Sequence, residues 1–287
     1  LSVGNEILLK SASNNVEFNQ KLLGIYNSCG IEGLALVDFP KEDLGKFLDA
    51  NKPDAAAWFG SSRVIKAVAP EFAQRMIEFL PECEGNEMVY ISNSYKDIKK
   101  AAGIILHSLI RHQGQCCNAI KGILIESSIK DKLITEVKAE ALKLKGGSIN
   151  LSNIDFIAPT LVKGLDPFQE EEALPTVSEV SGDLEMFLNN NPFTVKQWIY
   201  TVKDLDEALG VVRKNPFGIG FTLFSDSNKE ITEIINSVNT ARINLNRDPL
   251  EVNYTEPWGG TGLSGFGGAR PWLDKFSNKT YLAGADD

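Results

Sequence analysis

Histidine and cysteine are scarce in this chain, and their scarcity argues against several kinds of site. The 287 residues include two histidines and four cysteines. The two histidines, His107 and His112, are too few for a histidine-based metal centre, and they offer few candidates for the histidine of a Ser-His-Asp triad. The cysteines match no zinc-binding spacing, and two of them, Cys116 and Cys117, are adjacent. We therefore expect no metal, and we expect reduced thiols, as in a cytoplasmic protein.

Long apolar runs and clusters of positive charge are also missing from the sequence. The longest apolar stretches, such as residues 103–106, are far too short to span a bilayer, and residues 1–10 show no secretion signal. A formal net charge of −9 disfavours binding to nucleic acid or to anionic membranes. With 43% hydrophobic residues, the chain can bury a large core and form two domains.

Short apolar runs alternate with amphipathic segments along most of the chain. Regular alternation of strand and helix favours a parallel, doubly wound sheet, so we predict an α/β fold. For residues 146–191, the polar and turn-forming composition predicts turns and short extended pieces. The predicted strands are residues 6–9, 34–37, 55–59, 88–92, 122–125, 219–224 and 242–246. The predicted helices are residues 16–29, 42–50, 63–80, 95–113, 129–142, 204–213 and 228–238.

The sequence Gly-Gln-Cys-Cys-Asn at residues 114–118 lies between a predicted helix and a predicted strand. Reactive groups of α/β proteins are often presented at such edges. A thiolate on Cys117 could add to a carbonyl carbon, and Asn118 or nearby main-chain N–H groups could bind the resulting oxyanion. Both cysteines could equally be small buried hydrophobic residues, and the C-terminus of a helix would not lower a thiol pKa.

Three further segments carry candidate functional residues, each with a plainer structural alternative. Glu82, between a helix and a strand, could act as a general base or be a solvated turn carboxylate. Gly60 and Ser61 could let a phosphate approach the N-terminus of the following helix, although an ordinary strand–helix turn explains them equally well. The glycine-rich residues 257–267, which include Trp258, could form an ordered segment near a pocket. They could equally be a flexible linker.

Taken together and in order, these segments resemble the aldehyde dehydrogenase superfamily over essentially the whole chain. Residues 4–10, Gly-Asn-Glu-Ile-Leu-Leu-Lys, resemble the family's Gly-Asn-x-x-x-x-Lys strand. Gly60-Ser61 matches its Phe-Thr-Gly-Ser turn. Residues 81–85, Pro-Glu-Cys-Glu-Gly, are similar to Glu-Leu-Gly-Gly, and residues 114–117 fit Gly-Gln-x-Cys.

The resemblance continues through the second half of the chain. Residues 215–219 are similar to the family's Pro-Tyr-Gly-Leu segment, and Asn246 fits the asparagine that ends the following strand. Residues 257–267 resemble Pro-Phe/Trp-Gly-Gly-x-x-x-Ser-Gly-x-Gly. The implied fold is a Rossmann-like parallel sheet, belonging to a partial cofactor domain, together with an α/β catalytic domain. The expected ranges are 1–84 for the partial NAD(P)-binding domain, 85–267 for the catalytic domain and 268–287 for a C-terminal tail that could serve oligomerisation.

The family's activity is the NAD- or NADP-dependent oxidation of an aldehyde to a carboxylic acid. By resemblance, the Cys117 thiolate attacks the aldehyde to give a thiohemiacetal, hydride leaves to the nicotinamide, and Glu82 activates the water that hydrolyses the thioester. Asn118, Asn246 and Trp258 are expected near the oxyanion and the substrate. A small aldehyde is the expected ligand, and homo-oligomerisation is expected as well.

The resemblance also places residues at the cofactor. Lys10 is expected to bind the adenosine ribose or its phosphate, and Gly60 and Ser61 face the diphosphate. Phe193 belongs to the segment that best aligns with Glu-x-Phe-Gly-Pro, at the nicotinamide ribose. Ser13 stands where many NAD-preferring members have glutamate, and the missing carboxylate favours tolerance of NADP.

Three departures from the family pattern support an alternative function. Asn191 replaces the glutamate that holds the nicotinamide ribose, and Glu84 replaces the first glycine of Glu-Leu-Gly-Gly. The sequence starts just before the Gly-Asn-x-x-x-x-Lys strand, so half of the cofactor domain is expected to be missing or supplied by a partner. The alternative to an enzyme is a degenerate, non-catalytic homologue with a structural or binding role in an assembly.

Overall fold

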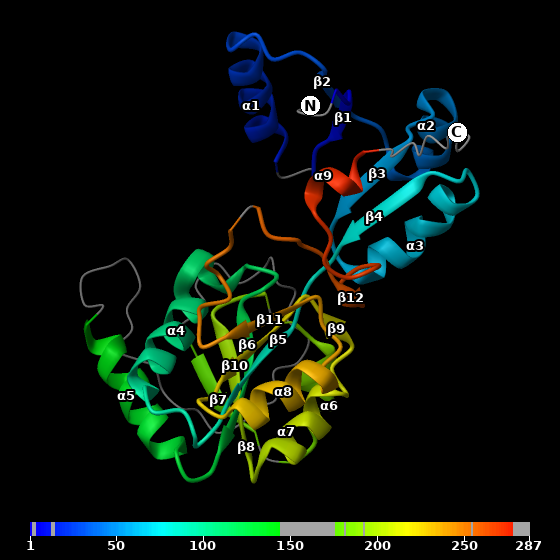
Figure 1. The fold of residues 1–287 in the computed structure, drawn as a ribbon. Coiled ribbons are helices and arrows are strands. Elements are labelled where there is room, and N and C mark those ends of the chain that lie inside the picture. Colours follow the sequence, from blue (N-terminus) through cyan, green and yellow to red (C-terminus); the bar gives the residue numbers. More distant parts are fainter. Residues whose placement is uncertain are drawn as a thin grey trace, which may run out of the picture. The chain divides into compact units, whose positions relative to one another are not determined.

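The computed structural model describes residues 1, 4–12, 15–143, 176–180, 182–191, 193–253 and 255–277. These residues confirm the predicted α/β fold, and the chain divides into two compact units (Figure 1). The first unit comprises Leu1–Trp58, Val64–Leu80 and Pro271–Asp287, and the second comprises Phe59–Arg63 and Pro81–Arg270. The expected functional domains, 1–84, 85–267 and 268–287, stay a prediction.

The first unit begins with a parallel pair of strands. β1 (Ile7–Lys10) pairs with β2 (Leu34–Val37), and α1 (Val16–Ser28) connects them. None of the residues of α1 is buried, and Phe18 is 65% exposed. A helix that covers a sheet normally buries an apolar face. This part of the unit therefore has little core of its own.

The rest of the first unit is built around a small apolar core. β3 and β4 pair with each other, and their C-terminal ends lead into the second unit. Leu44, Leu48, Val68 and Phe72 form the core, and the ring of Phe72 stacks on a neighbouring phenylalanine. The elements are η1 (Lys41–Asp43), α2 (Leu44–Asn51), β3 (Ala55–Phe59), α3 (Ser62–Ala73), β4 (Glu78–Glu82) and the short α9 (Trp272–Lys275).

Six parallel strands form the centre of the second unit, in the order β11-β10-β5-β6-β8-β7. Every residue of β5 and β6 is buried, as expected for parallel strands that are covered on both faces. The strands are β5 (Glu87–Ile91), β6 (Ile120–Glu126), β7 (Thr176–Glu179), β8 (Lys196–Val202), β10 (Gly220–Phe224) and β11 (Arg242–Leu245).

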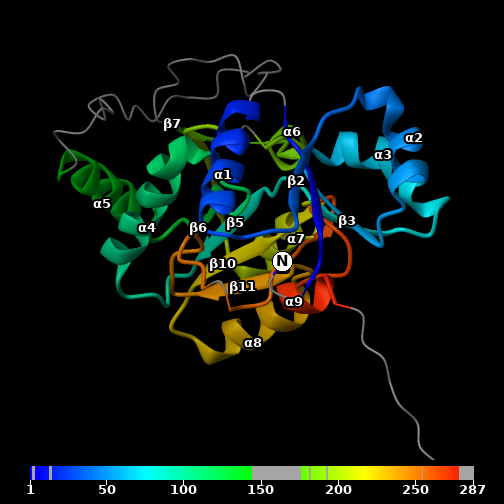
Figure 2. The same ribbon diagram turned by 90° about the horizontal axis from the view of Figure 1, so that it is seen from above.

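Helices cover both faces of this sheet (Figure 1 and Figure 2). α4 (Ile98–Ile110) and α5 (Lys130–Lys143) pack on one face. The opposite face is covered by α6 (Glu185–Asn189), α7 (Leu205–Val212) and α8 (Asn228–Ser237). The remaining elements are η2 (Arg111–Gly114) and the antiparallel pair of β9 (Phe217–Gly218) with β12 (Thr261–Gly262). Within the described ranges, no helix combines the length and the apolar character needed to cross a membrane.

The sequence prediction omits the short elements α6, β9, β12 and α9, and it differs from the structure in two longer segments. Residues 63–80 are predicted as one helix, but α3 ends at Ala73 and β4 begins at Glu78. Met76 lies between them with a φ of 53°, a left-handed conformation that ends helices. No strand is predicted at β8, which lies between β6 and β7, although its Trp, Ile, Tyr, Thr and Val residues are typical of strands.

The two segments that carry the predicted catalytic residues enter neighbouring strands of the sheet. Residues 82–86 lead from β4 into β5, and residues 115–119 lead from η2 into β6. β5 and β6 are hydrogen-bonded and parallel, so both begin at the same edge of the sheet. The candidate active site therefore lies at this edge.

Candidate active site

The loop that carries Cys117 is held by close main-chain contacts. Gly114 has a φ of +69°, and a Cβ on it would lie 2.3 Å from the Thr194 carbonyl oxygen, so a larger residue does not fit. The buried ammonium group of Lys121 donates to the carbonyl oxygens of Gly114 and Thr194. The loop is therefore tied to the segment that enters β8.

The sequence analysis missed Lys121, which is 1% exposed at the start of β6. Burial lowers its pKa to about 8. Its ammonium group also lowers the pKa of Cys116, which burial raises. The signal in the sequence is a charged residue directly before the apolar run 122–125, because a charged residue in a buried strand must find buried partners.

Gly85 brings the predicted base and the predicted nucleophile together. A Cβ on Gly85 would lie 2.1 Å from the carbonyl oxygen of Cys117, so the two main chains touch. Glu82, three residues before Gly85, is 9% exposed, and its charge acts on the Cys117 thiol. The next residue, Cys83, donates its main-chain N–H to the Ser264 carbonyl oxygen at 3.0 Å, within the glycine-rich segment. Three of the motifs singled out in the sequence therefore meet at one edge of the sheet.

Replacing Gly85 by alanine is expected to destabilise the chain by roughly 3 kcal/mol or more, because the new methyl group overlaps the Cys117 carbonyl. Urea-induced unfolding followed by circular dichroism measures this change. Gly103→Ala is the matched control, since a Cβ at Gly103 on α4 meets nothing within 4 Å. It is expected to stabilise the chain by about 0.5–1 kcal/mol. Equal stability of the two variants would contradict the contact.

The Cys117 thiol is protonated at neutral pH in the resting structure. Its pKa is raised to about 11, mostly by burial. The negative charges of Glu82 and Glu87 raise the pKa further. A main-chain N–H, that of Asn118, donates to the sulfur and acts in the opposite direction. The thiol therefore needs a proton acceptor before it can attack a carbonyl carbon.

The side chain and the main chain of Asn118 have different partners. The side-chain amide, which is buried, donates to the Pro249 carbonyl oxygen at 2.6 Å. It thereby fastens the chain after β11 to the nucleophile loop. The main-chain N–H faces the Cys117 sulfur instead. The main-chain N–H group of Asn118 is therefore a candidate donor to an oxyanion formed next to this sulfur.

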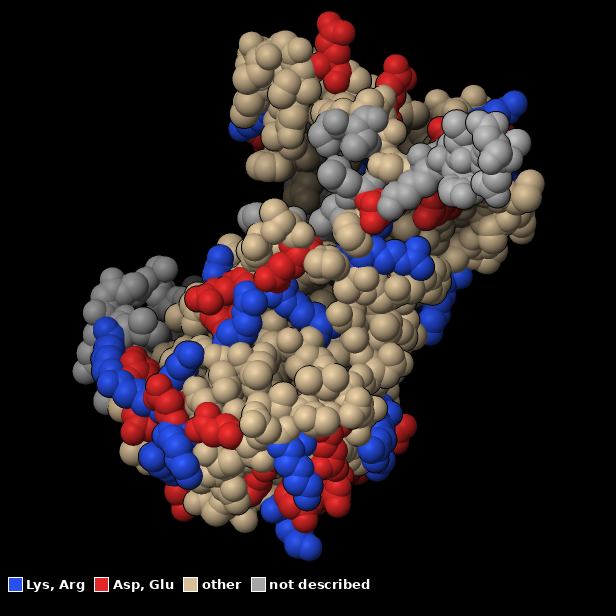
Figure 3. Space-filling model, viewed as in Figure 1, with Lys and Arg blue, Asp and Glu red and all other residues tan. Residues whose placement is uncertain are grey.

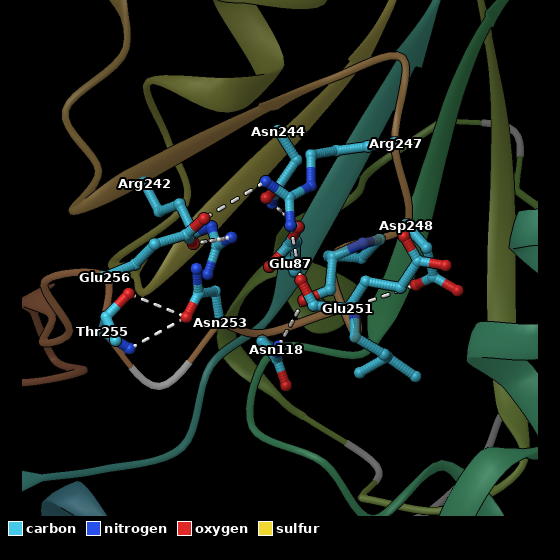
Figure 4. A network of polar contacts seen from close by, with 12 residues as sticks. Glu87, Asn118, Arg242, Asn244, Arg247, Asp248, Glu251, Asn253, Thr255 and Glu256 are labelled. Carbon is cyan, nitrogen blue, oxygen red and sulfur yellow. Dashed lines mark hydrogen bonds and ion pairs between the residues drawn. The ribbon is translucent and has the colours of Figure 1, made fainter.

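Glu87 is a buried member of a network of polar contacts that also includes Asn118 (Figure 4). One carboxyl oxygen accepts hydrogen bonds from Thr222 at 2.7 Å and from Asn244 at 3.2 Å. Burial raises the pKa of Glu87 to about 8, while Thr222, Asn244 and the charge of Arg242 lower it and Asp248 raises it. The sequence analysis missed this carboxyl group, which is buried at the first residue of β5.

The stability of the chain is expected to depend on the protonation of Glu87. Its pKa is about 8 in the folded chain against 4.5 for an exposed glutamate. Between these pH values the folded state keeps a proton that the unfolded state releases, so the free energy of unfolding falls as pH rises from 4.5 to 8. Glu87→Gln is expected to remove this fall, which amounts to roughly 2–5 kcal/mol.

Urea titrations between pH 5 and pH 9 measure the dependence on Glu87. Glu251→Gln, an exposed position drawn in the same network in Figure 4, is the control and should keep the pH dependence of the unaltered chain. A pH dependence that survives in Glu87→Gln would contradict the assignment.

Asn246 and Trp258 have structural partners. Asn246 follows β11 with a φ of 52°. Its side chain accepts from the main-chain N–H of Ser225 at 3.0 Å and donates to the carbonyl oxygen of the same residue at 2.9 Å. Trp258 is half-buried and forms an antiparallel bridge with Arg270. The partners of Asn246 and Trp258 lie away from Cys117 in the sequence, and the roles of these two residues at the substrate stay predictions.

The residues expected at the cofactor are spread over both units. Lys10, in the first unit, forms an ion pair with Asp38 at 3.9 Å and lies 5.2 Å from the centre of the Phe39 ring. Ser13 lies outside the described residues. Gly60 and Ser61, in the second unit, precede α3, and the main-chain N–H of Gly60 donates to the Glu82 carbonyl oxygen at 3.2 Å.

Phe193 and Asn191 lie next to the segment that carries Glu82. Asn191 donates its side-chain N–H to the Gly85 carbonyl oxygen. Its amide oxygen accepts from the main-chain N–H of Phe193 at 2.9 Å. Phe193 has a φ of 41°, so this short turn is held in a left-handed conformation by the Asn191 side chain. Both ends of the Asn191 amide are therefore used inside the chain.

Glu84 lies at the N-terminus of α3, where the family resemblance places the diphosphate of the cofactor. Its carboxylate accepts from the main-chain N–H of Ser62 at 2.7 Å and from the Ser62 hydroxyl group at 2.8 Å. The free N–H groups of a helix N-terminus are an anion site, and this one already binds an anion of the chain itself. With Glu84 so placed, a diphosphate would have to displace this carboxylate to bind at the N-terminus of α3.

Clusters of charge suggest no other kind of site. Among the described residues, no group of His, Cys, Asp and Glu side chains is arranged to hold a metal ion. On the face drawn in Figure 3, basic and acidic side chains lie next to one another rather than in one basic patch. The edge of the sheet with Cys117 and Glu82 is therefore the candidate active site.

Comparison with known proteins agrees with the motifs at this edge. The sequence model of the aldehyde dehydrogenase family matches residues 1–161 and 175–281. The chain belongs to the aldehyde dehydrogenase family. This confirms the resemblance found in the sequence and assigns the chain to a family of aldehyde-oxidising enzymes.

Individual relatives are distant and longer. The fatty aldehyde dehydrogenase HFD1 of Saccharomyces cerevisiae is 25% identical over 93% of this chain and 56% of its own length. The alpha-ketoglutaric semialdehyde dehydrogenase of Bacillus subtilis is 21% identical over 91% of this chain and 59% of its own length. The chain thus spans less than two thirds of these relatives.

Solved structures share the fold. The NADP-dependent glyceraldehyde-3-phosphate dehydrogenase of Bacillus halodurans, complexed with NADP, has a TM-score of 0.80 and 19% identity, covering 96% of this chain and 62% of its own. The NAD-dependent aldehyde dehydrogenase of Sinorhizobium meliloti has a TM-score of 0.77 and 19% identity, covering 95% of this chain and 60% of its own. At this identity the likeness establishes the fold.

Proposed function

We propose that the chain oxidises an aldehyde to a carboxylic acid, with NAD or NADP as the hydride acceptor, Cys117 as the nucleophile and Glu82 as the base. The observation that supports this proposal is the contact of Gly85 with the Cys117 carbonyl, because it brings the segment with Glu82 and the loop with Cys117 to one edge of the sheet. We further propose a small aldehyde as substrate, a cytoplasmic location and a homo-oligomer.

The residues at this edge support covalent chemistry on sulfur. Cys117 releases its proton to water, its sulfur forms a bond to the carbonyl carbon, and the carbonyl electron pair moves to the oxygen. The main-chain N–H of Asn118, next to the sulfur, can donate to this oxyanion. NAD or NADP, when bound, would supply the hydride acceptor for this carbon, and the loss of the hydride would leave a thioester on Cys117.

Glu82 then serves the second half of the reaction. Its carboxylate takes a proton from water, the hydroxide adds to the thioester carbon, and the sulfur of Cys117 leaves as the acid is released. Glu82 is 9% exposed, so its carboxylate works in a partly dry environment, close to the thiol that it acts on. The names of the relatives, fatty aldehyde and semialdehyde dehydrogenases, support an aldehyde as the substrate class.

The test is to incubate the chain with a panel of fatty aldehydes and semialdehydes and with NAD or NADP. Formation of the carboxylic acid, in equal amount to the reduced nicotinamide, is the expected result. The dependence of the rate on NAD and NADP concentration would also test the tolerance of NADP predicted from Ser13. Unchanged aldehyde across the panel would contradict the proposed function.

A non-catalytic homologue is the second candidate, and two observations favour it. The carboxylate of Glu84 occupies the N-terminus of α3, and both ends of the Asn191 amide have partners inside the chain. Mass spectrometry separates the two candidates, because an enzyme is expected to form an aldehyde adduct on Cys117 and a non-catalytic homologue is not.

A further inference from the structure

The Glu84 carboxylate occupies the anion-binding N-terminus of α3 through its contacts with Ser62. α3 has twelve residues, and its first main-chain N–H groups have no carbonyl partner within the helix. The Ser62 N–H and hydroxyl group point at the two oxygens of one carboxylate, at 2.7 and 2.8 Å. Hydrogen bonds to an ionised acceptor are about twice as strong as those between neutral groups, so this contact is a firm one.

The groups that hold Glu84 are the groups a phosphate would use. Phosphates bind at helix N-termini through main-chain N–H groups, often beside a glycine and a hydroxyl group. Gly60, two residues before Ser62, lacks a side chain that would keep such a ligand away. A phosphate at Ser62 would have to displace the Glu84 carboxylate, and a nearby Glu84 would still repel it.

The position expected to hold the nicotinamide ribose is also occupied by a side chain that has partners inside the chain. Asn191, which stands at the position expected to hold the nicotinamide ribose, donates to the Gly85 carbonyl and accepts from Phe193. Glu84 and Asn191 are the two replacements that distinguish this part of the sequence from the family pattern. The side chains of both residues form hydrogen bonds with other residues of the second unit.

We propose that the Glu84 carboxylate is an internal competitor for the phosphate groups of NAD or NADP at the N-terminus of α3. The chain is held in a state of low dinucleotide affinity until Glu84 is displaced. This inference rests on the proposed function, because it takes a dinucleotide to be the ligand of this edge.

The test compares ADP, which carries a diphosphate, with adenosine, which carries none. Isothermal titration calorimetry with Glu84→Gln and Glu84→Gly measures the dissociation constants. ADP is expected to bind both variants about tenfold or more tightly than it binds the unaltered chain. Adenosine is expected to bind all three proteins with affinities that agree within about twofold, since it has no group for the α3 terminus.

Glu78→Gln is the matched control, because it removes the same charge from an exposed position on β4. It should leave ADP binding unchanged. An equal gain for Glu78→Gln would overturn the proposal by assigning the effect to net charge. ADP affinities that agree within about twofold among the unaltered chain and both Glu84 variants, or undetectable binding to all of them, would overturn it as well.

The outcome for Glu84 is distinguishable from that for the proposed function. ADP binding involves neither Cys117 nor turnover. A gain in ADP affinity without any oxidation of aldehydes would support the role of Glu84 and count against the enzyme. Aldehyde oxidation together with unchanged ADP affinity in the variants would support the enzyme and count against the role of Glu84.

Discussion

Replacing Cys117 by alanine is expected to lower aldehyde oxidation by about a thousandfold or more. The thiohemiacetal and the thioester both form on the sulfur of this residue, and alanine offers no atom for either. The measurement is the rate of carboxylic acid formation at a saturating aldehyde concentration. Intact-protein mass spectrometry should show the aldehyde adduct on the unaltered chain and none on the variant.

Cys116→Ala is the matched control for Cys117. Both cysteines are partly buried neighbours in one loop, but Gly85 contacts the Cys117 carbonyl and the Asn118 N–H faces the Cys117 sulfur. Cys116→Ala is expected to keep its rate within about threefold of the unaltered chain. A larger loss with Cys116→Ala than with Cys117→Ala would show that the nucleophile is wrongly assigned.

Replacing Glu82 by glutamine is expected to have two effects in opposite directions. Acid formation should fall about a hundredfold or more, because glutamine cannot take a proton from water. Alkylation of Cys117 by iodoacetamide should become faster, because the negative charge that raises the pKa of this thiol is removed. At a fixed pH below the Cys117 pKa, the gain is expected to be about two- to tenfold.

Mass spectrometry of the alkylated peptides follows Cys117 separately from the other three cysteines. Glu84→Gln serves as the control, since its carboxylate is bound by Ser62 and is not among the charges that raise the Cys117 pKa. Its alkylation rate at Cys117 should equal that of the unaltered chain. Slower alkylation in Glu82→Gln would instead mean that Glu82 takes the proton of the thiol itself.

Much of the fold could be predicted from local patterns. The strands that become β1, β2, β3, β5, β6, β10 and β11 are short apolar runs between turn residues, and a parallel sheet follows from their alternation with helices. The prediction failed after Ala73, where a left-handed Met76 ends α3 and a strand follows. Residues 196–202 carried a strand signal of their own, but nothing local indicates that this strand lies between β6 and β7.

The candidate site, too, could be predicted from the sequence only in part. The order of the motifs along the chain was enough to predict Cys117 and Glu82 as the catalytic residues, because each motif is a local string of residues whose spacing is visible in the sequence. The other important groups were visible only as isolated charges. Lys121 and Glu87 are single charged residues at the start of apolar strands, and their partners lie on other strands or loops.

By itself the sequence determined the α/β class, the family and the two residues expected to carry the chemistry, since these depend on patterns within short segments. Only the tertiary structure decided that Gly85 touches the Cys117 loop, that Lys121 holds this loop to Thr194, and that Glu84 occupies the N-terminus of α3. These contacts join residues that are between 22 and 73 positions apart. They depend on how strands pair and turns approach one another, and no local preference of the chain encodes that information.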